Sequence, residues 1–169
     1  MTLRPLLKAI LIGGLICGAL DLLFAISFAG YNGAAPSRVL QTIASGLLGD
    51  AAFAAGIGVA ILGVGCHFAL SILWAVVFAI ASWRLPVLAR RPFVTGLAFG
   101  VIVFLCMRLL VLPLSAYPHP VTFKPLATVL DLLSHMLLFG VPIAMIVSRA
   151  IRARRPNNSF KPKPLRGSA

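Results

Sequence analysis

Five ionisable side chains lie within otherwise apolar stretches of the sequence, and these residue types are the ones best suited to chemistry: Asp21, His67, Arg108, Asp131 and His135. A charged group inside a membrane costs about 2.5–3.5 kcal/mol on insertion scales, so it needs a partner or a wet cavity. We therefore expect the five residues to form one buried polar cluster. Arg108 should pair with one or both aspartates, with His135 as a neighbour.

Three functions suit such a cluster. In the first, the protein is non-enzymatic and the cluster organises a helix bundle, because ionic networks commonly serve packing. In the second, the protein is a small proton or solute transporter that uses Asp21, Asp131 and His135 as relay groups. In the third, His67 and His135 hold a haem, since they lie at similar depth on helices that run in the same direction. We favour the first, and the transporter is the main alternative.

Sequence motifs of common enzymes and metal sites are missing. There is no GxSxG elbow, phosphate-binding loop, HExxH or CxxC motif in the chain. The cysteines, Cys17, Cys66 and Cys106, fall inside apolar runs without ligand spacing. We predict no catalytic residue, no metal site, no disulfide and no cofactor.

The segments that carry these residues are predicted to be membrane spans. The chain has 169 residues, 60% of them hydrophobic and 11% charged, whereas soluble domains have about 25% charged residues. A spanning helix needs ~20 apolar residues. Apolar runs of this kind predict spans at about residues 9–29, 57–81, 93–112 and 126–147. We therefore expect an all-α transmembrane four-helix bundle over residues 1–150.

The first apolar run also resembles a signal peptide, because it follows the basic residues Arg4 and Lys8. Its apolar stretch is ~20 residues long, however, against 7–15 in a cleaved signal sequence, and Asp21 interrupts it. We expect a retained span. Small residues with GxxxG spacing, at Gly14/Gly18 and Gly96/Gly100, mark where the helices should approach one another.

A short amphipathic helix is predicted at about residues 37–49, in the first outer loop. Arg38 and Thr42 fall on one face at helical spacing, and Leu40 and Ile43 fall on another. The segment is too short and too polar on one side to span a bilayer. We expect it to lie in the membrane interface.

Basic residues set the predicted orientation. The net charge of +12 comes from residues between the spans and in the tail, which is the arrangement of a membrane topology and not of a nucleic-acid-binding surface. Cytoplasmic loops carry the excess of Lys and Arg. Both termini are therefore predicted to be cytoplasmic, with only Arg38 and Lys124 outside. The basic, proline-rich tail, residues 151–169, is expected to be disordered.

Four segments resemble a family of small uncharacterised bacterial inner-membrane proteins with four helices: Val39–Gly49, Leu62–Phe68, Arg91–Ser115 and His135–Ala144. The resemblance implies a multi-pass protein of the bacterial inner membrane, and that family has no activity to transfer. The expected partner is the lipid bilayer. A homo-oligomer and a small-molecule or ion substrate are left open.

Overall fold

The computed structural model describes residues 4–54 and 56–154. Within these residues there are helices and no strand. Helices long and apolar enough to cross a membrane number four: Arg4–Tyr31, Ile57–Arg84, Pro92–Leu114 and Pro125–Ala153. The predicted all-α four-helix fold is confirmed, and the chain is a multi-pass integral membrane protein.

Two of the spans change helix type along their length. In chain order the elements are α1 (Arg4–Tyr31), α2 (Pro36–Leu48), α3 (Ala51–Ala54), α4 (Ile57–Arg84), α5 (Pro92–Cys106), the π-helix η1 (Met107–Val111), α6 (Leu112–Leu114), α7 (Pro125–Ser134), the π-helix η2 (His135–Gly140) and α8 (Val141–Arg154). The third span therefore runs through α5, η1 and α6, and the fourth through α7, η2 and α8.

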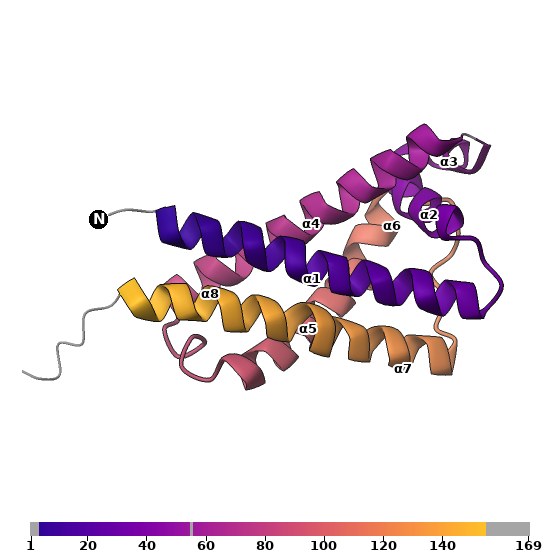
Figure 1. Ribbon diagram of the computed structural model, residues 1–169. Coiled ribbons are helices and arrows are strands. Elements are labelled where there is room, and N and C mark those ends of the chain that lie inside the picture. Colours follow the sequence, from indigo (N-terminus) through magenta and orange to yellow (C-terminus); the bar gives the residue numbers. More distant parts are fainter. Residues whose placement is uncertain (1–3, 55, 155–169) are drawn as a thin grey trace, which may run out of the picture.

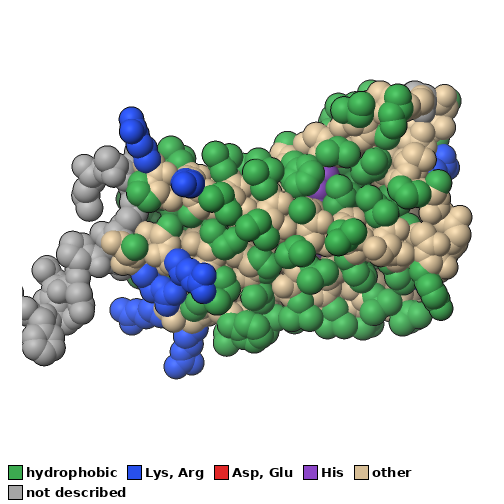
Figure 2. Space-filling model, in the orientation of Figure 1, with side chains coloured by type: hydrophobic (Ala, Val, Ile, Leu, Met, Phe, Trp, Pro, Cys, Tyr) green, Lys and Arg blue, Asp and Glu red, His purple; other side chains and the backbone are tan. Residues whose placement is uncertain are grey.

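The bundle has two chemically different ends. The beginning of α1, the loop between α4 and α5 and the end of α8 lie together at the end that we call the basic end (Figure 1). Figure 2 shows most of the Lys and Arg side chains in view gathered there, with an apolar surface along the rest of the bundle. The opposite end, which we call the cavity end, carries α2, α3 and the loop that joins α6 to α7 (Figure 1).

Glycines allow the helices to touch, as the GxxxG spacing predicted. A Cβ atom at Gly14 would lie 2.7 Å from the Cα atom of Ile72 on α4, and one at Gly96 would lie 2.7 Å from the Cα atom of Val141 on α8. The contacts join α1 to α4 and α5 to the fourth span. Between them, toward the basic end, the bundle is filled by buried apolar side chains that include Phe78.

Each π-helix ends two residues before a proline. Proline has no N–H, and its ring clashes with the carbonyl four residues earlier in an α-helix. The residue before Pro113, Leu112, donates its N–H to the carbonyl of Met107, five residues back. Val141, before Pro142, likewise donates to the carbonyl of Met136. The wider turns allow both prolines to remain within continuous spans.

The boundaries of two predicted segments need correction. The third span was expected to end at about residue 112, but the helix continues through Pro113 to Leu114 because η1 accommodates the proline. The tail was expected to begin at residue 151, but α8 continues to Arg154. The predicted disorder of the tail concerns residues that, from 155 onward, lie outside the described part of the chain.

The predicted amphipathic helix corresponds to α2, and it packs onto the bundle. The backbone of Leu40 contacts Gly63 of α4, where a side chain would leave no room. Ser45, on the polar side of α2, is fully buried. The helix ends at Gly49, which adopts a φ of 60° and donates its N–H to the carbonyl of Ser45. Part of the polar face of α2 is therefore turned into the bundle.

Replacing Gly96 by Ala should destabilise the bundle, because the new methyl group would meet the backbone of α8, which cannot move aside alone. Overpacking of this kind costs about 1–3 kcal/mol. We expect a lower midpoint of thermal unfolding in detergent. The matched control is Gly65→Ala on α4, where a Cβ atom has open space, and its midpoint should not fall. A drop of the same size in both variants would contradict the close contact.

Candidate functional site

The five ionisable residues predicted to cluster line one cavity. Its volume is about 470 Å³, and it lies at the cavity end between the spans and α2. Asp21 comes from α1, His67 from α4, Arg108 from η1, Asp131 from α7 and His135 from the first turn of η2. All four spans thus contribute to one polar site. The loop between α6 and α7 adds the rim of the cavity, at Tyr117, Pro120, Val121, Thr122 and Lys124.

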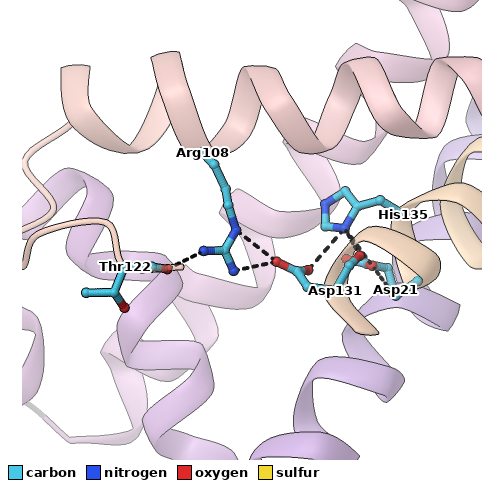
Figure 3. A network of polar contacts seen from close by, with 6 residues as sticks. Asp21, Arg108, Thr122, Asp131 and His135 are labelled. Carbon is cyan, nitrogen blue, oxygen red and sulfur yellow. Dashed lines mark hydrogen bonds and ion pairs between the residues drawn. The ribbon is translucent and has the colours of Figure 1, made fainter. Parts of the chain in front are cut away.

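Arg108 pairs with Asp131 and not with Asp21. Its Nη2 and Nε atoms lie 2.7 and 3.1 Å from Oδ2 of Asp131 (Figure 3). Its third nitrogen, Nη1, donates to the carbonyl oxygen of Thr122 at 2.8 Å. The guanidinium group also lies over the ring of Phe104, at 5.3 Å from the ring centre. One arginine therefore ties η1 to α7 and to the loop at the rim.

His135 lies between the two carboxylates. Its Nδ1 atom is 3.2 Å from Oδ1 of Asp131 and 3.9 Å from Oδ1 of Asp21 (Figure 3). The same atom is 2.9 Å from the carbonyl oxygen of Asp131. Because all of these neighbours are acceptors, Nδ1 carries the hydrogen and donates it. Asp21 also accepts a hydrogen bond of 2.7 Å from the hydroxyl group of Ser134.

His67 lines the same cavity but is held separately. Its Nε2 atom lies 2.9 Å from the carbonyl oxygen of Gly18, so this nitrogen donates its hydrogen to the backbone of α1. A haem between His67 and His135 would have to use the two other ring nitrogens. In the part of the chain that the structure describes, no group of three or more His, Cys, Asp or Glu residues is arranged to hold a metal ion.

A second, smaller cavity continues from the first toward the middle of the bundle. Its volume is about 60 Å³, and Asp21, His67 and His135 line both spaces. Trp74 lines the smaller cavity and Thr128 the larger one. Among the described residues, Nε1 of Trp74 and Oγ1 of Thr128 are buried without a hydrogen-bond partner. Since buried polar groups normally have partners, these cavities are suited to polar contents.

No protein-family model, curated protein or solved structure matches this chain. The function is therefore inferred from the geometry of the site. The resemblance to small bacterial inner-membrane proteins remains a prediction.

Some residues of the site were not expected. Ser134 follows Asp131 by three residues and precedes His135, so its place on the same helical face was a usable signal. The carbonyl group of Thr122 gives no such signal, because its position depends on the path of a loop. The arrangement as a whole offers hydrogen-bond donors, acceptors and charges of both signs to a polar guest.

Arg108→Ala should destabilise the protein by about 1–3 kcal/mol, because it leaves the Asp131 carboxylate in a largely enclosed site without its charged partner. Adding Asp131→Asn should recover part of this loss by removing the orphaned charge. Unfolding in detergent, followed by circular dichroism, would measure both effects.

The control for this pair is Arg108→Ala combined with Asp21→Asn. Asp21 makes no contact with Arg108, so this second change should recover nothing. Equal stability of Arg108→Ala and its double variant with Asp131→Asn would refute the pairing.

Proposed function

We propose that the chain is a non-enzymatic protein of the bacterial inner membrane that binds a polar group in the 470 Å³ cavity, which the group reaches from the non-cytoplasmic side. The observation that supports this function is that the ionisable residues surround a space instead of filling it. Structural networks in protein interiors are close-packed, and pockets for small molecules have volumes of about 300–1,000 Å³.

The cluster divides into two parts with different roles under this proposal. Arg108 and Asp131 satisfy each other and hold η1, α7 and the rim loop together, so they serve the structural role expected of the whole cluster. Asp21, His67 and His135 line both cavities and face the guest. The polar residues thus organise the bundle and leave a binding site within it.

The orientation follows from the distribution of charge. Arg84, Arg90, Arg91, Arg149 and Arg152 belong to the basic end, together with the start of α1. Because positive residues favour the cytoplasmic side, we place the basic end in the cytoplasm. The cavity and the loop at its rim then face the outside.

Binding is favoured over transport by the packing of the other half of the bundle. Below the cavities, toward the basic end, Phe78, Ile143 and Val147 are fully buried, at 1% exposure or less. They belong to the apolar core of the bundle. We infer that this core separates the cavities from the basic end in this conformation.

Proton translocation is the second candidate, and the 60 Å³ cavity supports it. Asp21, His67 and His135 line this space, which extends deeper into the bundle than the main cavity. Intramembrane Asp and His residues are typical proton-relay groups. Translocation would require the apolar core below to open.

A cysteine at position 128 tests access to the cavity. Thr128 lines it, whereas the next residue, Val129, is 53% exposed on the apolar exterior. In a background without Cys17, Cys66 and Cys106, Thr128→Cys should react with external 2-sulfonatoethyl methanethiosulfonate about tenfold faster than Val129→Cys, because only the thiolate reacts and lipid disfavours it. Labelling would be measured by mass spectrometry in right-side-out membranes. Equal rates, or labelling of Thr128→Cys from the cytoplasmic side alone, would refute the proposal.

Proton translocation has its own test. If the protein translocates protons, proteoliposomes with a trapped pH-sensitive dye and an imposed pH gradient will show a leak above that of empty liposomes, and Asp21→Asn will remove most of it. Asp50→Asn, in the exposed loop before α3, is the matched control and should leave the leak unchanged. A leak that is absent, or insensitive to Asp21→Asn, would rule this candidate out.

A further inference from the structure

An apolar groove lies beside the polar cavity. Its volume is also about 470 Å³, and its walls come from α2, α4, η1 and α6. Apart from Thr42, His67 and Ser115, the lining side chains are apolar or thiol-bearing. Two of them, Leu47 and Leu73, are 65% and 54% exposed. In a bilayer the groove is therefore open sideways, to the lipid chains.

The groove and the polar cavity lie next to each other. They share five lining residues: Thr42, Ile43, His67, Met107 and Leu112. His67 also lines the small inner cavity, so its ring stands where the three spaces meet. A single molecule with an apolar part and a polar part can occupy the groove and the cavity together.

The charges in the cavity indicate which polar group fits. Asp131 has Arg108 as its counter-ion. Among the described residues, Asp21 has no Lys or Arg within ion-pair distance, and the nearest basic side-chain nitrogen is Nδ1 of His135 at 3.9 Å. The Asp21 side chain is only 13% exposed. A largely buried carboxylate without a strong counter-ion favours a cationic guest that donates hydrogen bonds.

We propose that the groove and the cavity form one binding site for an amine-bearing membrane amphiphile. Its ammonium group lies against Asp21 in the polar cavity, and its hydrocarbon chain lies in the groove between α2 and α4. This inference rests on the proposed function and names the ligand class. Lateral opening favours a lipid-soluble ligand over a water-soluble one, because the chain of the ligand stays in an apolar environment throughout.

Retention of phospholipids by the full-length protein tests the proposal. The protein would be incubated in detergent with equimolar phosphatidylethanolamine and phosphatidylglycerol of identical acyl chains, and bound lipid would be counted by native mass spectrometry. We expect about tenfold preference for phosphatidylethanolamine, equivalent to ~1.4 kcal/mol. Asp21→Asn should abolish the preference, since it removes the charge that the amine recognises.

The groove is tested by a bulky substitution in its wall. Ala69 lines the groove and neither of the two cavities beside it, and its side chain is exposed. Ala69→Trp should lower the retention of phosphatidylethanolamine about tenfold by filling the space of the acyl chain. The matched control is Ala98→Trp on the exposed face of α5, which lines neither the groove nor the two polar cavities, and it should retain the lipid as the parent protein does. Because neither position lies in the core, both variants should fold.

Three results would overturn the inference: equal retention of the two lipids, a preference that survives Asp21→Asn, or equal effects of Ala69→Trp and Ala98→Trp. These failures are separate from failure of the proposed function. If the external reagent labels Thr128→Cys but the two lipids are retained equally, the polar cavity is still supported as a binding site, and the proposal that its ligand is an amine-bearing amphiphile is wrong. If the cysteine is not labelled from outside, the proposed function itself fails.

Discussion

The structure depends on one constraint: an ionisable side chain in a membrane-spanning helix must turn away from the hydrocarbon and find a polar neighbour. Every span carries at least one such side chain, and all of them reach the same cavity. Arg108 satisfies the constraint most fully, since its nitrogens contact Asp131 and the carbonyl oxygen of Thr122. Asp21 satisfies it less fully, through a hydroxyl group and a distant imidazole. This difference in the number of polar partners distinguishes the structural pair of Arg108 and Asp131 from Asp21, which is suited to binding.

The helices pack differently in the two halves of the bundle. Toward the basic end, glycines and apolar side chains bring the spans into close contact, as at Gly14 and Gly96. Toward the cavity end, α4 diverges from α1 and α2 lies in the space beside it (Figure 1). Gly63 lets α2 approach α4 closely, but α2 does not fill the whole opening. The remaining volume is the polar cavity and the apolar groove, so the site exists because a short helix completes a bundle that is open at one end.

Much of this arrangement could be predicted from the sequence. Apolar runs of the length of a bilayer predicted the spans, and the cost of a charge in the membrane predicted that the ionisable residues point inward. The choice of Asp131 over Asp21 as the partner of Arg108 could not be predicted, because it depends on distances between helices that are remote in sequence. The cavity also could not be predicted from the sequence, since the order of residues does not show how much space is left between side chains. The prolines gave a signal for disrupted helix geometry, but not for a widened turn that lets Pro113 remain helical.

Each widened turn contains one residue more than an ordinary α-helical turn. Deleting a residue elsewhere in a span would rotate everything beyond it by about 100° and turn the apolar face the wrong way. Deleting one within Met107–Val111 or His135–Gly140, together with replacement of the proline that follows, would instead restore a regular helix and leave both flanks in phase. These two segments are therefore the places where a homologous chain could lose a residue and keep its scaffold. Such a chain would redirect Arg108 or His135, so that the scaffold and the polar site can diverge independently during evolution.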